Sequence, residues 1–234
     1  EHATTQLRNS IVGIRGRMLE FCRGISNRLV KFDPFMYITF RSASSIFVTS
    51  EQSKACVPKH FHSKTFVELG IGVDIPIRDT GNVAALSDDN ALQILYAGQL
   101  IHWKGVHLAI AALKRLCESG ASARLTIVGR GVEEKNLRSQ AEEMGIDTYI
   151  DWVPWMSHED MRCFYKNFDC FLYPSLHDSG GLVVLEALSC GTPVVCLDIG
   201  GPGVIVNESC GAAIKVRNRD VDQLVGDLAF AVQE

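Results

Sequence analysis

Three strand-to-helix turns in the second part of the sequence carry residue types that could bind a phosphorylated ligand. Each turn has glycine close to a predicted helix start and also carries a lysine or a carboxylate. In open α/β sheets ligands bind beyond the carboxyl ends of the strands, so these turns form the candidate site. The turns are YAGQLIHWKG (96–105), IVGRGVEEKNL (127–137) and LYPSLHDSGGLVVLEALSCGTPVV (172–195).

The third turn has the chemistry that a nucleotide-linked ligand needs. Gly180 and Gly181 open a predicted helix, where free backbone N–H groups and the positive end of the helix dipole favour a phosphate. Glu186 follows about one turn later, and its carboxylate could accept two hydrogen bonds from a ribose diol. Lys104, from the first turn, would add a positive charge for a diphosphate.

Each of these features also has a plain structural explanation. Gly-Gly before a helix is common turn chemistry, and a lysine such as Lys104 at a helix start is commonly solvated. Glu186 is the more informative residue, because it lies within the apolar run LVVLEALSC. Burying an unpaired carboxylate is costly, so this position favours a functional role.

Other polar clusters favour structural roles. The cysteine and histidines near residue 60 have no second ligand pair for a metal, the acidic pair near residue 220 suits a helix start, and no GxSxG elbow supports a hydrolase triad. The sequence therefore predicts no metal site. These clusters are Cys56 with His60 and His62, Asp220 with Asp222, and His177-Asp178-Ser179.

Composition is that of an ordinary globular chain. It has 234 residues, 47% hydrophobic and 21% charged, with a net charge of -4, and its mean hydropathy is +0.09 with a pI near 6.0. These values exclude disorder, and the mild acidity argues against nucleic acid as a partner. No apolar run is long enough to span a membrane. The 8 cysteines are scattered singly, as expected for reduced thiols in a cytoplasmic protein.

Strand and helix patterns alternate in the second part of the chain, which predicts an α/β fold with a Rossmann-like parallel sheet covered by helices on both faces. We expect a partial first lobe at 1–75, a linker at 76–90 and a nucleotide-sugar-binding domain at 91–234. The predicted strands are 44–50, 64–74, 92–98, 123–129, 148–153, 169–174, 192–198 and 212–216. The predicted helices are 7–31, a short one from Glu51, 104–119, 132–144, 157–167, 182–190, 201–208 and 219–234.

Taken together, the turns resemble the retaining GT-B glycosyltransferases of family 4. The family's most specific signature, P-S-x-x-E-x-x-G-x-x-x-x-E-A-x-x-x-G-x-P-V-V, is matched in register at Pro174-Ser175, Asp178, Gly181, Glu186-Ala187, Gly191 and Pro193-Val194-Val195. Its G-R-L-x-x-x-K-G pattern corresponds to Gly98-Gln99-Leu100 and Lys104-Gly105, its G-x-G turn to Leu125–Gly131, and its v-x-F-x-G pattern to Ile150–Met161, with Trp152 for Phe and Pro154 for Gly.

The resemblance implies transfer of a sugar, of the hexosyl type, from a nucleotide-diphosphate donor to an acceptor hydroxyl with retention of configuration. It implies no obligatory metal and no covalently bound cofactor. Lys104 would neutralise the diphosphate leaving group, Asp178 would touch the transferred sugar and Glu186 would hold the ribose. Further donor-binding residues would be Gly98, Gln99, Gly129, Trp152, Val153, Gly180, Gly181 and Leu182.

Three departures from the family pattern bear on rate and donor choice. Asp178 replaces Glu and is one methylene shorter, Gln99 replaces an Arg that pairs with the diphosphate, and Val204 stands where an acid often follows the Gly-Gly of 200–201. These changes leave open an alternative, namely a non-catalytic nucleotide or nucleotide-sugar binding module.

The chain begins at Glu1 and stops inside a helical pattern, so we expect a fragment truncated at both ends and inactive by itself. The expected partners are a nucleotide sugar and a glycan, lipid-linked or small-molecule acceptor. Residues 7–31 carry one apolar stripe and a basic face. They are a candidate for peripheral contact with the inner face of a membrane, although a solvated helix face is the simpler interpretation.

Overall fold

A computed structural model describes residues 25, 33–68, 70, 72–73 and 91–234. The predicted helix 7–31, apart from Ile25, and the predicted linker 76–90 lie outside the described residues. The chain divides into two compact units, 1–71 and 72–234, and each unit is described by itself. The boundaries expected from the sequence stay a prediction.

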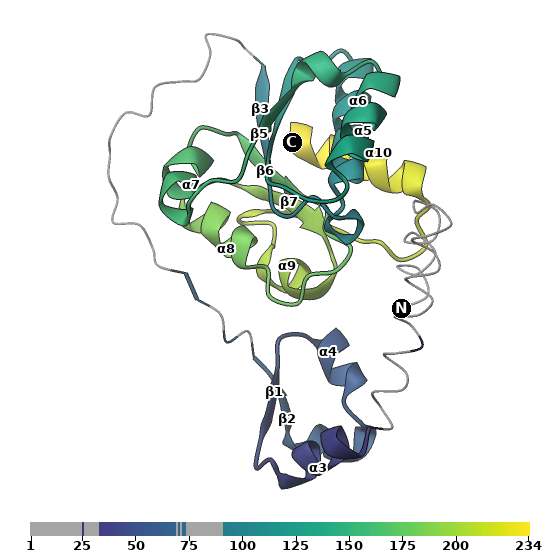
Figure 1. The fold of residues 1–234 in the computed structure, drawn as a ribbon, viewed down its shortest axis with the longest axis vertical. Coiled ribbons are helices and arrows are strands. Elements are labelled where there is room, and N and C mark those ends of the chain that lie inside the picture. The colour runs from purple at the N-terminus through teal and green to yellow at the C-terminus, as the bar shows by residue number, and fades with distance from the viewer. Residues whose placement is uncertain (1–24, 26–32, 69, 71, 74–90) are drawn as a thin grey trace. The chain divides into compact units, whose positions relative to one another are not determined.

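The second unit is built on a parallel sheet of six strands in the order β5-β4-β3-β6-β7-β8 (Figure 1). Every residue of β6 and β7 is buried, as expected for apolar strands covered on both faces. All six strands were predicted from their apolar runs, and the α/β prediction is confirmed. The strands are β3 (Leu92–Ala97), β4 (Ala123–Val128), β5 (Ile150–Val153), β6 (Cys170–Tyr173), β7 (Val194–Leu197) and β8 (Gly211–Ile214).

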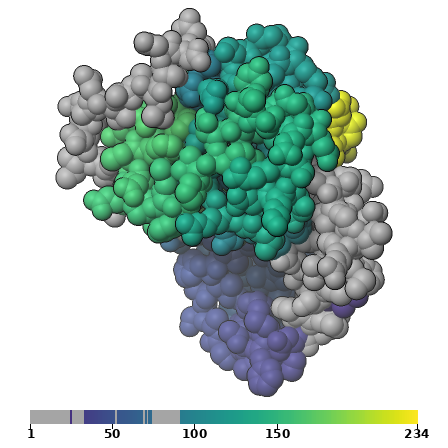
Figure 2. Space-filling model, turned by 45° about the horizontal axis from the view of Figure 1, so that its top comes forward, coloured from purple at the N-terminus to yellow at the C-terminus, as the bar shows by residue number. Residues whose placement is uncertain are grey.

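Helices cover both faces of this sheet (Figure 1). One group packs together as α5, α6 and α10, and the other as α7, α8 and α9. In the space-filling view the segments from β3 to α8, teal to green, form one closely packed body (Figure 2). The helices are α5 (Val106–Glu118), α6 (Glu134–Glu143), α7 (His158–Tyr165), α8 (Leu182–Ser189), α9 (Gly200–Ile205) and α10 (Val221–Gln233), with short 3-10 helices η2 (His102–Lys104) and η3 (Asp147–Tyr149).

The strand order decides where a ligand can bind. From β3 the chain moves outward through β4 and β5, and it then returns to the other side of β3 to build β6, β7 and β8. This is the doubly wound arrangement, and its direction reverses between β3 and β6. Because both strands are parallel, the turns that follow them leave the same edge of the sheet side by side.

The first unit contains two short parallel strands, β1 (Ile46–Val48) and β2 (Thr65–Val67). Its small core consists of Ile46, Val57 and Phe61. The segment 44–50 was expected to be a buried strand, but Phe47 is 64% exposed, so β1 is buried on one face only. Among residues 33–68 of this unit, the helical segments are α3 (Pro34–Ser42), α4 (Glu51–Cys56) and η1 (Lys59–Lys64).

Helix α3 was not predicted from the sequence, although its start carries a recognisable signal. Asp33 is the N-cap and accepts a hydrogen bond from the backbone N–H of Phe35 at 2.8 Å. Pro34 occupies the first helical position, where its missing N–H costs nothing. Asp-Pro before an apolar run was therefore the signal that could have identified this helix.

Candidate functional site at the β3–β6 switch point

The turn after β3 packs directly on the turn after β6. The backbone N–H of Leu176 donates to the carbonyl of Trp103 at 2.8 Å. Gly105 has a φ of 73°, and a Cβ at this position would collide with the carbonyl oxygen of Pro174. Glycine is therefore required here both by the backbone conformation and by the close approach of the two turns. This contact brings η2, with Lys104, against the segment that carries Asp178.

Lys104, Tyr173 and Asp178 form a triangle of hydrogen bonds at this point. The Lys104 ammonium donates to Oδ2 of Asp178 at 2.6 Å and to the hydroxyl of Tyr173 at 2.7 Å. The Tyr173 hydroxyl in turn donates to the same Asp178 oxygen at 2.7 Å. The side chains of Lys104 and Asp178 are 19% and 16% exposed. The two charges are therefore paired and mostly shielded, yet accessible to a ligand.

The second carboxylate oxygen of Asp178 joins the cluster to helix α8. Oδ1 accepts from the backbone N–H groups of Gly180 at 3.1 Å and Gly181 at 2.8 Å. Gly181 is the N-cap of α8 and has a φ of 70°. The carbonyl of Asp178 accepts from the N–H of Gly201 at 2.9 Å, where α9 begins. Two of the amides expected to face a ligand are thus already bonded to a side chain of the protein.

These contacts shift the protonation equilibria of the cluster. Burial by itself would raise the pKa of Asp178, but the hydrogen bonds from Lys104, Gly181 and Tyr173 outweigh it and lower the pKa to about 2. Burial raises the pKa of Tyr173 well above its usual value, and the Asp178 carboxylate raises it further. At neutral pH the site therefore holds a carboxylate and a neutral phenol.

This low pKa predicts a pH-dependent contribution to stability. The pKa of Asp178 lies below its ordinary value of 3.8, so its contribution is present above about pH 4 and is lost as the pH falls towards 2. Because the carboxylate keeps some access to solvent, the contribution to the free energy of unfolding is about 1–2 kcal/mol. Denaturant unfolding of the wild type and Asp178→Asn is expected to show their difference shrinking by this amount between about pH 5 and pH 2. A difference that stays constant over this range would contradict the low pKa.

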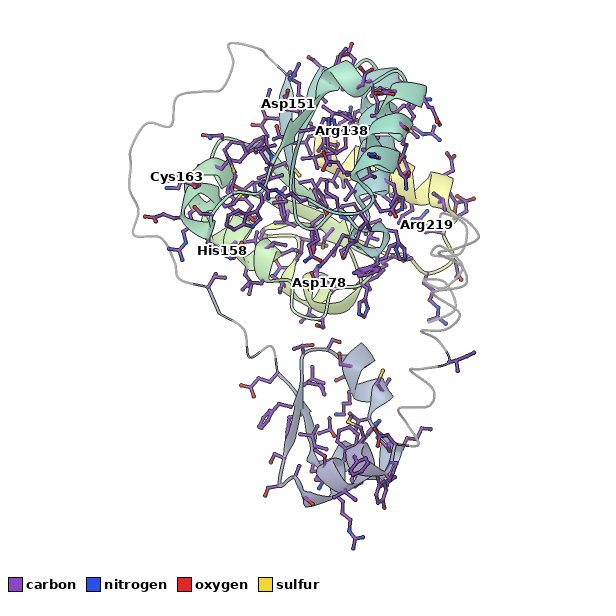
Figure 3. All side chains as sticks on the ribbon, viewed as in Figure 1. Arg138, Asp151, His158, Cys163, Asp178 and Arg219 are labelled. Carbon is purple, nitrogen blue, oxygen red and sulfur yellow. The ribbon has the colours of Figure 1, made fainter. Side chains whose placement is uncertain are left out.

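Glu186 lies on α8, and its carboxylate is 17% exposed. It has two protein partners that its sequence context did not indicate. His158, at the start of α7, approaches Oε1 at 3.3 Å, and the buried Tyr165 hydroxyl donates to Oε2 at 3.4 Å. Both distances are long for hydrogen bonds, so the carboxylate keeps capacity for further donors. Asp178 and His158, labelled in Figure 3, lie on the side of the sheet that carries α8.

Two tyrosines that donate hydrogen bonds to these carboxylates, Tyr165 and Tyr173, were not among the predicted site residues, although the sequence carries a signal for them. Tyr165 and Tyr173 each stand at a core position of an apolar run and are both 1% exposed. A buried tyrosine hydroxyl needs a hydrogen-bond partner. For both residues that partner is a carboxylate singled out from the sequence.

The glycines of the second turn have a structural function. Gly129 has a φ of 152°, and a Cβ there would collide with the carbonyl of Gly98, while one on Gly131 would collide with Leu100. The N–H of Leu100 donates to the carbonyl of Arg130 at 2.9 Å. The two turns therefore pack backbone to backbone. Gln99, predicted to face the donor, is exposed at this edge.

Trp152 and Val153 end strand β5, and both are partly exposed. The Arg138 guanidinium of α6 lies over the Trp152 ring at 4.5 Å from its centroid, in the geometry of a cation–π contact. Trp152 therefore has a packing partner in the protein. Trp155, two residues beyond the end of β5, is 64% exposed.

The acidic pair near residue 220 has a structural role at the start of α10. Asp220 is the N-cap of α10 in a reciprocal capping box with Gln223, and Asp222 pairs with Arg115. Within the described residues no group of three or more metal-ligating side chains occurs. None of the described helices is long and apolar enough to cross a bilayer.

A parallel six-stranded sheet whose strand order reverses between β3 and β6 defines the Rossmann-like, doubly wound α/β class of protein. The family model for glycosyl transferases group 1 matches residues 79–234. The chain belongs to this family.

Known proteins similar to this chain agree with that assignment. A glycogen synthase of Mycobacterium tuberculosis is 35% identical over 142 residues, which make up 60% of this chain and 33% of that protein. The chain thus spans about a third of this relative.

Two solved structures share the fold. The apo form of the lipopolysaccharide outer core galactosyltransferase WaaB superposes with a TM-score of 0.65 at 23% identity, over 82% of this chain and 53% of that chain. Anabaena Alr3699/HepE in complex with UDP superposes with a TM-score of 0.64 at 21% identity, over 84% of this chain and 56% of that chain.

Proposed function

We propose that this chain supplies the nucleotide-sugar-binding part of a retaining glycosyltransferase of hexosyl type. The observation that carries the proposal is the position of Lys104 beside Asp178 at the switch point, in a family of glycosyl transferases. A lysine at this point can neutralise the charge that develops on a departing nucleoside diphosphate. The acceptor would be a glycan, a lipid-linked sugar or a small molecule.

The roles of the other residues follow from their positions. Glu186 would accept hydrogen bonds from the ribose hydroxyls, sharing its carboxylate with His158 and Tyr165. The backbone at Gly98, Gly129 and Leu182 lies at or next to the carboxyl edge of the sheet, where a donor would lie. Asp178 would contact the transferred sugar through an edge of its carboxylate while holding Lys104.

We further propose that the 234-residue chain binds a nucleotide but transfers no sugar by itself. The residues assigned to the donor all lie between Gly98 and Glu186. Holding an acceptor beside the anomeric carbon can be worth about 7–11 kcal/mol of the barrier. We infer that the chain, whose match covers about a third of the glycogen synthase, positions the donor alone and therefore lacks this contribution.

Calorimetric titration of the chain with UDP, GDP and ADP, and with their sugars, tests the donor role. Binding of one nucleoside diphosphate in preference to the matching nucleoside supports it. Absence of binding to all three would contradict it, and transfer to an added acceptor would contradict the inactivity of this chain. With a full-length protein, the anomeric configuration of the product by NMR tests retention, and donor hydrolysis separates an enzyme from a binding module.

Gln99→Arg is expected to strengthen the binding of nucleoside diphosphates more than the binding of nucleosides. The exposed Gln99 lies on the turn that carries Lys104, and the paired Lys104 leaves much of a diphosphate charge unmatched. Replacing a neutral hydrogen bond by a charge-assisted one should contribute about 1 kcal/mol, roughly fivefold in affinity. Parallel titrations with UDP and uridine measure the difference, and an equal effect on both ligands would show that residue 99 does not face the phosphates.

A further inference from the structure

Tyr173 is held rigidly at the end of the strand that leads into the site. It is the last residue of β6, and all four residues of this strand are buried. Its ring stacks on Phe171 at 5.6 Å between centroids and on Tyr96 at 6.0 Å. Contacts with two aromatic rings of the sheet restrict the orientation of the Tyr173 ring, so the position of its hydroxyl is set by the sheet.

The hydroxyl links the two charges of the site. It accepts a hydrogen bond from the Lys104 ammonium and donates its own proton to Asp178, both at 2.7 Å. A phenol has one proton and can accept from a further donor, so both bonds form together. Phenylalanine would fill the same space in this strand, and only tyrosine provides the link.

The link restrains a side chain that is otherwise flexible. Lysine carries a compact charge on a four-carbon stem with many rotamers. In this site Lys104 is bonded at its tip to two groups that are themselves fixed, Tyr173 by the sheet and Asp178 by the start of α8. An ammonium has three donor hydrogens. These two bonds leave one hydrogen for a ligand, so Lys104 can meet a phosphate without leaving Asp178.

We propose that Tyr173 is a positioning residue, whose hydroxyl holds Lys104 and Asp178 as one preorganised unit that receives the diphosphate of a nucleotide. The identity of the ligand rests on the proposed function, whereas the positioning itself concerns only contacts within the protein. Preorganisation raises affinity because the ligand does not have to order the side chain that binds it.

Tyr173→Phe is the direct test, because it removes one oxygen atom and keeps the stacked ring. Tyr96→Phe is the matched control. Tyr96 is equally buried and stacks on Tyr173, but its hydroxyl donates to the carbonyl of Gln99 at 3.3 Å and not to the charged pair. Both variants are titrated with UDP and with uridine, or with the nucleotide that the wild type binds and its nucleoside.

We expect Tyr173→Phe to weaken nucleoside diphosphate binding by roughly 5–10-fold, and nucleoside binding by less than about twofold. In the ligand-free protein, NMR titration of the Asp178 carboxyl should show its pKa rising, because the Tyr173 hydrogen bond helps to lower it. Tyr96→Phe should change the Asp178 pKa and the diphosphate affinity by clearly less. If the Tyr173 hydroxyl had no positioning role, Tyr173→Phe would change neither the Asp178 pKa nor the affinity for the diphosphate.

The outcomes separate this proposal from the proposed function. The positioning role is overturned if Tyr173→Phe binds the diphosphate as tightly as the wild type, or if Tyr96→Phe loses as much diphosphate affinity as Tyr173→Phe. In either case the proposed nucleotide site stands. If the wild type binds none of the three nucleoside diphosphates, the proposed function fails. The Asp178 pKa then tests whether Tyr173 positions Lys104 and Asp178. A higher Asp178 pKa in Tyr173→Phe than in the wild type supports the positioning role, and an unchanged pKa overturns it.

Discussion

Replacing Glu186 by alanine is expected to weaken nucleoside binding by about 2–4 kcal/mol, the loss of two charge-assisted hydrogen bonds to the ribose. The carboxylate is 17% exposed on α8, and its contacts with described residues are long, to His158 at 3.3 Å and to Tyr165 at 3.4 Å. A ribose diol would therefore provide shorter hydrogen bonds than the protein does. Glu186→Gln keeps one acceptor oxygen and should lose less.

Isothermal titration with a nucleoside and its diphosphate measures this effect, which should be similar for both ligands because the ribose is common to them. Glu134→Ala is a matched control. Glu134 also lies on a helix, where its carboxylate pairs with Arg138 at 2.9 Å on the exposed face of α6. If Glu186→Ala bound the nucleoside as tightly as the control variant, the ribose role would be wrong.

The second large effect is expected for Lys104→Met, which keeps the length of the side chain and removes its charge. We expect a loss of about 2–3 kcal/mol for a nucleoside diphosphate and little change for the nucleoside. Two causes add together. The ammonium no longer binds a phosphate, and Asp178, left without its counter-charge, adds a negative charge to the site.

A double-mutant cycle separates these two causes. Adding Asp178→Asn to Lys104→Met removes the unpaired carboxylate, and part of the diphosphate affinity should return. Lys114→Met is the control for loss of a lysine, since Lys114 is partly exposed on α5 and pairs with Glu118 at 3.6 Å. Equal loss for diphosphate and nucleoside in Lys104→Met would indicate a general structural defect and contradict a role at the phosphates.

Much of the second unit could be predicted from its sequence. Each strand of the six-stranded sheet was predicted from a strand-like run, and the long helices α5 and α10 have the apolar spacing of one buried face. The α/β class follows from this alternation, because parallel strands need helical crossovers. The motif match also selected Lys104, Asp178 and Glu186, whose functional roles stay predictions. Local sequence was sufficient for these conclusions because they depend on residue type and spacing.

The first unit was less predictable. Its strands have three residues each, so they carry too few positions for a clear pattern, and Phe47 and Phe66 are apolar yet exposed. Burial was expected from the hydrophobicity of the segment that contains Phe47. Which face of such a short strand is covered depends on the elements packed against it, in this unit the core of Ile46, Val57 and Phe61.

Only the tertiary structure decided how the site is connected. Lys104 and Asp178 lie 74 residues apart in the chain, and they meet because β3 and β6 are neighbours at the point where the strand order reverses. Sequence spacing carries no information on that pairing. The same holds for Tyr173 and Tyr165, whose burial was readable from the sequence but whose partners were not. A hydroxyl at the end of a strand acquires its chemistry from the turns that the fold brings to it.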